Sequence, residues 1–579
     1  MGARLPRVTR PGAASRIVFL VAAAAASLAG CRGGADRREE VGLPPGRGLN
    51  VLVVSFDALR ADALPLYGYP RDTAPAMTAF GRQGIVFDRA YSAGQATPTS
   101  FAAAFSGRYP FRSFVGWRFA ADATLASAFS AAGYATAFFS ANVQLVPERG
   151  FGRGFGTYLI LPPDRFRDRD HDGVGDDEDV LRVSLAWLEA HRRRQPFLLW
   201  IHFLSPHSPY TYRESARAFY DDSYAGPFAT TTGHSFAPER PEDLSRVRDL
   251  YDGEVHFADG LFRRALAILE DMDLTARTVV VLTADHGEEF MEHGRLQHSS
   301  VHEEVTRIPL VIRHPARAEG RRVAAPVSNV DIFPTLAASL GVAAPTGADG
   351  VAVHRWAPTD RVVLSTAMTG REERLLAVVR GRHKTILDCG SGARRLFDLA
   401  EDPGERRDVS REMRQEMKEL LGEAARVMGG EPCRSLAAAA TRAPAAPALP
   451  SETRAGLMAL GYLGGGGQAP DEGALGTDPD PVTLCSETGV GSAIVWWRAP
   501  PGASEAEVRV GSPKGAIFAR GGARGEATTG DWVKRDTVFY LLDRSRNTVV
   551  ASHPVRVVTA SCAAATGTEA PPSPAPGAR

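Results

Sequence analysis

The chain has 579 residues, of which 44% are hydrophobic and 23% are charged, so it can bury at least one large core and is neither fibrous nor disordered. Lysine plus arginine and aspartate plus glutamate each total 67, so no overall field favours nucleic acid or a membrane surface. We therefore expect no nucleic-acid partner, and local groups of side chains must carry the function.

The N-terminus has the pattern of a targeting segment. A basic stretch without acids is followed by the apolar run IVFLVAAAAASLAG, which is too short to span a bilayer comfortably, and then by Cys31. The tetrapeptide LAGC resembles the lipobox of bacterial lipoproteins, whose cysteine is acylated in the mature chain. We expect residues 1–31 to be a lipoprotein signal peptide, and the mature protein to be membrane-anchored in the cell envelope, in the periplasm or at the cell surface. A plain signal peptide with an unrelated cysteine is the alternative.

Residues 49–345 alternate between buried-strand and helix patterns. Short apolar runs occur at NVLVVSF, PFLLWIHF and RTVVVLTA, and segments with helical periodicity, such as residues 179–194 and 256–272, lie between or beside them. This alternation is typical of an α/β fold with a mostly parallel central sheet flanked by helices. We expect residues 32–48 to be a linker before this domain.

An acidic loop lies inside the same region. The spacing DxDxDGxxDxxD places oxygen ligands at Asp168, Asp170, Asp172, Val174, Asp176 and Asp179. The pattern is close to a calcium-binding loop, although it ends in aspartate where the EF-hand has a bidentate glutamate. We predict a structural calcium ion here, with a solvated acidic loop as the alternative.

The rest of the chain divides into four parts. Residues 346–430 combine the hairpin pattern AVVRGRHKTILD with a charged helix, and predict a C-terminal subdomain of the same fold. Residues 431–481 are rich in alanine, proline and glycine and read as a linker. Residues 482–562 contain short alternating strands that predict a small β-sandwich accessory module, and residues 563–579 form a disordered tail.

Four cysteines remain if Cys31 carries lipid. Cys389, Cys433, Cys485 and Cys562 are an even set, and disulfides persist in an oxidising compartment. Three pairings are available to them. We favour Cys389 with Cys433 and Cys485 with Cys562, because each pair lies within one segment.

Acidic and imidazole side chains follow three of the predicted strands. Asp57 follows the first strand, His207 comes shortly after the second, and Asp285 with His286 follows the third. In an open parallel sheet, ligands bind in the crevice outside the carboxyl ends of the strands. Carboxylates and imidazoles are the ligands of divalent metals, so the sequence predicts one metal-binding crevice. The alternative is that each residue only terminates its strand.

Six motifs in order resemble the sulfatase family of the alkaline phosphatase superfamily. They are NVLVVSFDALRADALPLYGYPRDTAPAMTAF, SGRYP, IHFLSPHSPY, TADHGEEFMEHG, HEEVTRIPLVIRHP and SNVDIFPTLAASLGV, and together they cover residues 49–345. The resemblance implies a central sheet flanked by helices and one divalent metal, calcium, manganese or zinc, at the active site.

The resemblance also implies roles for single residues. Asp57 matches the family's first acidic metal ligand, although Ala58 follows it where many sulfatases have a second acid, and Asp285 with His286 matches the second pair of ligands. His207 matches a substrate-binding or catalytic histidine. His298 matches a position at which many members place a lysine or histidine against the transferred group. His202 and His293 are nearby, and we expect them to be supporting or structural residues.

Thr97 occupies the nucleophile position of this pattern. It lies ten residues before Gly107, where sulfatases have a cysteine or serine that is oxidised to formylglycine; threonine cannot give that product, and Pro98 is one place early. Threonine fills this role in the superfamily's phosphoethanolamine and phosphoglycerol transferases and in some phosphodiesterases. The alternative is that Thr97 only caps the helix that follows it.

The sequence thus predicts an extracytoplasmic, metal-dependent hydrolase of the sulfatase family. It would cleave a sulfate or phosphate ester of a glycan, lipid or small molecule, with Thr97 as nucleophile. Two alternatives stay open: a phosphoethanolamine- or phosphoglycerol-type transferase acting on an envelope glycan or lipid, and a non-catalytic binding protein that keeps the fold.

Overall fold

The structure is a computed structural model of the chain, and the residues form two compact units, Met1–Leu463 and Gly464–Arg579. The described residues are 38–161, 174–193, 196–233, 236–317, 319–368 and 374–441 in the first unit, and 474–478, 482–485, 493–499, 505–522, 524–529, 532–535, 537–544, 548–555 and 557–560 in the second.

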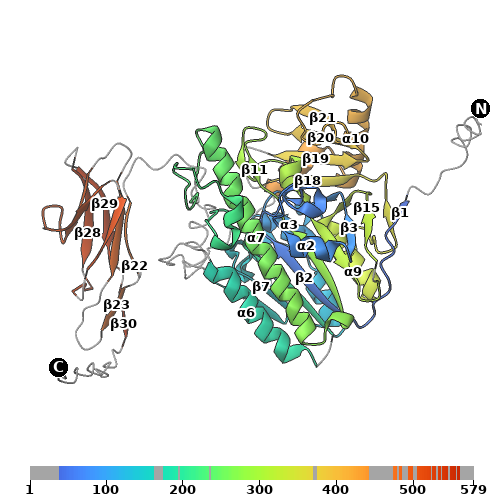
Figure 1. Cartoon of the computed structure of the whole chain (residues 1–579). Helices are drawn as coiled ribbons and strands as arrows, with labels where there is room; N and C mark the ends of the chain where they lie inside the picture. Colours follow the sequence, from blue (N-terminus) through green and yellow to red (C-terminus); the bar gives the residue numbers. More distant parts are fainter. Residues whose placement is uncertain are drawn as a thin grey trace, which may run out of the picture. The chain divides into compact units, whose positions relative to one another are not determined.

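An eight-stranded sheet organises the first unit, as the sequence predicts (Figure 1). Its order is β15 (Arg321–Val323), β3 (Ile85–Phe87), β14 (Leu310–Arg313), β10 (Thr278–Ala284), β2 (Asn50–Phe56), β9 (Phe197–Phe203), β7 (Ala135–Ser140) and β8 (Thr157–Ile160). Only β14 runs against its neighbours, so the sheet is mostly parallel. Every residue of β2, β9 and β10 is buried, which is why these strands read as continuous apolar runs.

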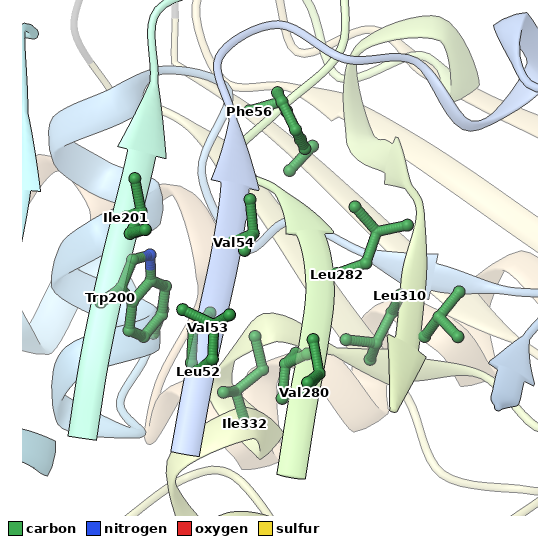
Figure 2. Close-up of a cluster of buried hydrophobic side chains, with 14 of the residues drawn as sticks. Leu52, Val53, Val54, Phe56, Trp200, Ile201, Val280, Leu282, Leu310 and Ile332 are labelled. Carbon is green, nitrogen blue, oxygen red and sulfur yellow. The ribbon is translucent and has the colours of Figure 1, made fainter. Parts of the chain in front are cut away.

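Helices flank this sheet. Figure 1 shows α6 (Val174–His191) and α7 (Pro241–Asp271) crossing one face, where α7 also contacts α2 (Pro75–Gly81). A second group, α3 (Thr97–Ser106), α5 (Leu125–Ala131) and α9 (Ile332–Leu340), packs together. The core between sheet and helices is closely packed, and Figure 2 shows Val54, Trp200 and Leu282 among its side chains.

A four-stranded antiparallel sheet follows in the same unit. Its strands are β18 (Val363–Ala367), β19 (Leu375–Arg380), β20 (His383–Asp388) and β21 (Arg394–Asp398), and α10 (Arg414–Met428) contacts β19 and β20. This is the hairpin and charged helix that the sequence predicts for residues 346–430. Leu376, Val378 and Leu420 share a hydrophobic cluster, which holds the helix on the sheet.

Both predicted linkers contain folded structure, which corrects the domain boundaries. Within residues 32–48, β1 (Arg38–Glu40) pairs with β17 (Trp356–Pro358), and Val41 and Leu43 after it are buried. Within residues 431–481, α11 (Pro432–Thr441) buries Leu436, because an alanine-rich segment favours helix once an apolar side chain has a surface to pack on. Long-range contacts of this kind leave no local sequence signal.

The second unit consists of short strands with a core of its own. Its sheets are β22 (Ala474–Asp478), β24 (Ile494–Arg498) and β27 (Arg524–Thr528); β23 (Val482–Cys485) with β30 (Val557–Ala560); and β26 (Ala516–Gly521), β25 (Ala506–Val510), β28 (Val538–Asp543) and β29 (Thr548–Pro554). Val495 of the first sheet and Val508 and Leu541 of the third share one hydrophobic cluster, so two sheets face each other across a core. The unit begins earlier than residue 482, because β22 belongs to it.

Among the residues that the structure describes, no helix combines the length and the apolar character needed to cross a membrane.

Candidate active site

The ends of three adjacent strands form the floor of the site. Strand β2 lies between β10 and β9, and all three are parallel, so their carboxyl ends lie at one edge of the sheet. Asp57 follows β2, Asp285 and His286 follow β10, and His202 lies near the end of β9. Ala58 has a left-handed φ of 59°, and it turns the chain directly after Asp57.

The predicted metal ligands Asp57, Asp285 and His286 are brought together and are fully enclosed. One ligand atom from each lies within 4.8 Å of the others. His286 Nε2 is 3.5 Å from Asp57 Oδ1 and 3.6 Å from Asp285 Oδ2. Ligands at about 2.0–2.2 Å from a tetrahedral ion are separated by about 3.3–3.6 Å, so the three atoms have the spacing of a metal-binding set.

Hydrogen bonds hold one oxygen of each carboxylate and leave the other facing the cluster. Asp285 Oδ1 accepts the main-chain N–H groups of Ala58 and His286, at 3.2 and 2.7 Å. Asp57 Oδ2 accepts from the Asn142 amide at 2.6 Å. Asp57 Oδ1 and Asp285 Oδ2 are buried without a hydrogen-bond partner in the described part of the chain. Burying an unpaired carboxylate costs free energy of folding. A cation bound between these two oxygens would compensate their charge.

The orientation of His286 also suits a metal ligand. Its Nδ1 lies 2.9 Å from the carbonyl oxygen of Gly287, which only accepts, so Nδ1 carries the proton. The lone pair of Nε2 then points at the two carboxylates. A backbone acceptor that fixes the tautomer in this way is a usual feature of metal-binding histidines.

Thr97 presents its hydroxyl to the same cluster. Its Oγ1 is 3.4 Å from Asp57 Oδ2, 3.5 Å from His286 Nε2 and 3.3 Å from Asn142 Nδ2. Thr97 is the first residue of α3, whose N-cap is Ala96, and no side chain caps this helix. The alternative that Thr97 serves as the helix cap is therefore wrong. Its hydroxyl instead lies beside the candidate metal ligands, at the positive end of a ten-residue helix.

His207 and His298 lie beside the metal-binding set. The His298 ring centroid is 4.3 Å from that of His286 and 5.4 Å from that of His207. His298 Nδ1 donates to Glu288 Oε1 at 3.1 Å, and Tyr210 donates to the other Glu288 oxygen at 2.9 Å. His207 Nδ1 donates to the carbonyl of Ser208, so each imidazole has one nitrogen held by the protein. Such fixed rings are suited to proton transfer or to stabilising charge.

The charged side chains of this cluster shift one another's pKa values. Burial alone would raise the pKa of Asp57, but His207, His202 and His286 hold that pKa well below its usual value. Burial and then the charge of Asp57 raise the pKa of Asp285. Two neighbouring buried carboxylates with opposed shifts are typical of a site that a cation completes.

Three residues of the site were not identified as such from the sequence. His202 was expected to be a supporting residue, and its Nε2 lies 3.8 Å from Asp57 Oδ2 and 4.0 Å from Asp285 Oδ2, which raises its pKa although burial opposes this. Asn142 follows β7, so the strand-end rule used for Asp57 would have found it. Glu288 gave no signal beyond its place in the DHGEE motif, because its role depends on contacts with His298 and Tyr210.

The other predicted sites fall partly outside the described residues. Cys31, Cys562, Asp168, Asp170 and Asp172 lie there. Helix α6 begins at Val174, and Asp179 pairs with Arg182 one turn later. Cys389 and Cys433 form a disulfide, which joins the end of β20 to α11.

Comparisons with known proteins agree with this geometry. The sulfatase family model matches residues 49–342, about half of the chain. Arylsulfatase K of Xenopus laevis is 28% identical over 212 residues, which are 33% of this chain and 39% of that protein. The chain thus spans well under half the length of this relative.

Solved structures show the same fold. The phosphonate monoester hydrolase of Agrobacterium radiobacter superimposes with a TM-score of 0.55 at 20% identity, over 67% of this chain and 95% of that one. A second protein, solved in complex with its substrate D-glucosamine-2-N,6-O-disulfate, superimposes with a TM-score of 0.54 at 19% identity, over 66% of this chain and 98% of that one.

Proposed function

Because this chain belongs to the sulfatase family, we propose that it is a metal-dependent hydrolase of sulfate or phosphate esters in which Thr97 is the nucleophile. The observation that carries the proposal is the position of the Thr97 hydroxyl, 3.4 Å from Asp57 and 3.5 Å from His286. A hydroxyl is a weak nucleophile unless a neighbouring group activates it.

Asp57, Asp285 and His286 would hold the metal. When bound, a divalent cation there would supply positive charge that lowers the proton affinity of the Thr97 hydroxyl and offsets charge on the transferred group. An imidazole ligand favours zinc or manganese over calcium, which prefers oxygen ligands alone.

The protein's own residues account for the remaining steps. Asn142 donates to Asp57 and lies 3.3 Å from Thr97 Oγ1, so it fixes the direction of the hydroxyl. Attack forms a bond from Thr97 Oγ1 to phosphorus or sulfur and breaks the bond to the leaving oxygen, while the Thr97 hydroxyl proton passes to Asp57 Oδ2, 3.4 Å away. His298 or His207 donates a proton to that oxygen, with Glu288 supporting His298. Water then attacks the phosphorus or sulfur and gives a proton to the imidazole that protonated the leaving oxygen. Thr97 is released and its oxygen takes back the proton held by Asp57.

The threonine favours phosphorus. Formylglycine as a hydrate carries two hydroxyl groups on one carbon and can expel sulfate without further attack at sulfur. Thr97 has a single hydroxyl, so its ester must be broken by water at the central atom. A phosphate ester or diester of a glycan, lipid or small molecule is therefore our preferred substrate, with a sulfate ester second.

The transferase alternative uses the same first step. A hydroxyl of an envelope glycan or lipid would replace water as the acceptor, and Thr97 and the metal ligands would keep their roles. Transfer is distinguished from hydrolysis by the product, because only transfer leaves the phosphoryl group on the added alcohol.

We also propose that the mature protein is an envelope lipoprotein anchored through Cys31. The Cys389–Cys433 disulfide supports an oxidising compartment. Mass spectrometry of the mature N-terminus checks this, because unacylated Cys31 or an uncleaved leader would contradict it.

A panel of chromogenic esters tests the enzymatic proposal. We expect the zinc- or manganese-loaded protein to hydrolyse p-nitrophenyl phosphate, its diester or the sulfate, and Thr97→Ala to lower kcat by about 1,000-fold or more. Thr97→Ser, which keeps the hydroxyl, should retain measurable turnover. Equal turnover by Thr97→Ala and the parent would remove Thr97 from the mechanism, and binding of metal without turnover of any ester would favour the non-catalytic alternative.

A further inference from the structure

A second group of ligand-type side chains lies close to the hairpin formed by β11 (Glu289–Phe290) and β12 (Leu296–Gln297), which Glu288 precedes and His298 follows. We call it the rear cluster, and it consists of His293, His302, Glu304 and Glu405. One ligand atom from each lies within 4.8 Å of the other three. The residues come from the segment after β11, from the region around α8 (Glu303–Thr306), and from the loop that follows β21. None of them contributes to the set of Asp57, Asp285 and His286.

The distances within the rear cluster are those of a metal-binding set. His293 Nε2 is 3.4 Å from Glu304 Oε2, and His302 Nδ1 is 3.1 Å from Glu405 Oε2. Two ligands at about 2.0–2.1 Å from a tetrahedral zinc ion lie about 3.3 Å apart. The imidazole rings of His293 and His302 stack with their centroids 3.6 Å apart, so the nitrogens of the two rings lie close to each other.

His302 and Glu405 are hydrogen-bonded to each other, but two other atoms of the cluster are buried without a hydrogen bond to any described residue. They are His293 Nε2 and Glu304 Oε2, which face each other. Glu289 is fully buried beside His293 and Glu304, with the Ser300 side chain close to its carboxylate. Native proteins rarely leave buried polar atoms unsatisfied, so each such group calls for an explanation. A bound cation would contact both His293 Nε2 and Glu304 Oε2 at once.

Lysine and arginine side chains offset only part of the negative charge at the cluster, where the Arg395 guanidinium lies 3.4 Å from His302 Nε2. Glu289, Glu304 and Glu405 lie at or beside it, and Glu303 is close behind. Lys384 offsets part of this charge, with its Nζ 2.9 Å from Glu303 and 3.0 Å from Glu405. An additional divalent ion would neutralise the remaining carboxylates.

Strand β11 connects the two clusters. Glu288, the residue before β11, contacts His298, whereas Glu289, the first residue of the strand, lies beside the rear cluster. The main chain is also fixed there: Gly287 N donates to Val305 O and Glu288 N donates to Glu304 O. A Cβ on Gly287 would lie 2.0 Å from the main-chain carbonyl oxygen of Glu304, so only glycine permits the two chain segments to approach this closely.

We infer that the rear cluster is a second, structural site for a divalent transition-metal ion, with zinc as the best fit. Two imidazoles and two carboxylates suit zinc better than calcium or magnesium. The ion would join residues 293–304 to Glu405, which are about 100 positions apart in the chain. It would thereby fix the hairpin that carries Glu288 and His298. The most exposed of the four ligands is His293, whose side chain is 11% exposed, and this side gives the ion a route of entry.

Zinc content of purified full-length protein tests the inference. Protein stripped of metal, reloaded from a zinc buffer and desalted is assayed by inductively coupled plasma mass spectrometry, with folding checked by circular dichroism. We expect two zinc ions per chain. His293→Asn with Glu304→Gln should retain one, and Asp57→Asn with Asp285→Asn should also retain one, because each pair removes a different site. His314→Asn, a buried histidine outside both clusters, should retain two.

The outcomes separate this site from the active-site metal. Unchanged zinc in the folded His293→Asn, Glu304→Gln protein would overturn the inference, as would loss of all zinc from the folded Asp57→Asn, Asp285→Asn protein. If the His293→Asn, Glu304→Gln protein fails to fold, the Asp57→Asn, Asp285→Asn protein decides the question. It must still bind one zinc ion if the rear cluster is a metal site. Loss of ester hydrolysis in any variant leaves these counts valid, so the inference does not depend on the proposed activity.

Discussion

Thr97 is the residue at which this chain departs most from the sulfatase pattern. The structure places its hydroxyl among Asp57, His286 and Asn142, and we propose that it acts there as the nucleophile although the residue type differs from that of the family. A change of residue at an intact position alters which bond can be cleaved and leaves the metal-binding set untouched. This is why the proposed chemistry moves toward phosphate esters while the family assignment stands.

The buried side chain of Asp252 should make the free energy of unfolding depend on pH. It is buried on α7, and burial raises its pKa to about 6 against hydrogen bonds from Tyr69 and Arg71. The folded state therefore binds the Asp252 proton more tightly than the unfolded state does, so this contribution to stability is lost as pH rises. Between pH 4.5 and 7 the free energy of unfolding should fall by about 2 kcal/mol from this group.

Chemical denaturation of Asp252→Asn checks that expectation. The variant removes the titration, so its free energy of unfolding relative to the parent should be about 2 kcal/mol more favourable at pH 7 than at pH 4.5. Asp271→Asn, at the exposed end of the same helix, should show no such change. An equal offset at both pH values for Asp252→Asn would show that burial does not control this carboxyl.

The residues of the site differ in how far sequence predicts them. Asp57, Asp285 and His286 follow recognisable strands, so parallel pairing alone brings them to one edge. His202 points at the same carboxylates from within a strand, where an apolar run conceals it. The roles of Glu289 and Glu405 depend on contacts between segments about 100 positions apart in the chain. No local sequence pattern predicts such contacts.

At the scale of elements, α11 shows how a covalent link can define a boundary. The segment was expected to be part of a linker, and it forms a helix that the Cys389–Cys433 disulfide joins to β20. Leu436 buries against the same subdomain. The sequence predicted the cysteine pair but not the helix, because alanine-rich composition alone does not distinguish a packed helix from a flexible linker.

Removing this disulfide should loosen α11 and leave the central sheet intact. Its two cysteines are 44 positions apart, and closing a loop of that length stabilises by about 4 kcal/mol in the chain-entropy description. In Cys389→Ser with Cys433→Ser, we expect amide hydrogen exchange in α11 to accelerate by about tenfold or more, with β2 and β10 unchanged. Arg434→Ala, an exposed change on the same helix, is the control. Unchanged exchange in α11 would show that packing alone holds the helix.

At the scale of the whole molecule, all residues of the candidate active site belong to the first unit. The second unit, Gly464–Arg579, has a separate hydrophobic core and supplies none of the described site residues. A chain that ends at Leu463 should therefore hydrolyse a small chromogenic ester with kcat/KM within about twofold of the full chain. Loss of hydrolysis by a truncated protein that is folded and still binds metal would show that the second unit takes part in catalysis.

The central claim is that Thr97 carries the transferred group, and a covalent adduct tests it most directly. The metal-loaded protein is mixed with a chromogenic phosphate ester, quenched in acid within the first turnover, digested and analysed by mass spectrometry. The account predicts a phosphate ester on Thr97, and neither adduct nor turnover in Thr97→Ala. Turnover without an adduct on Thr97, together with activity that survives Thr97→Ala, would contradict it.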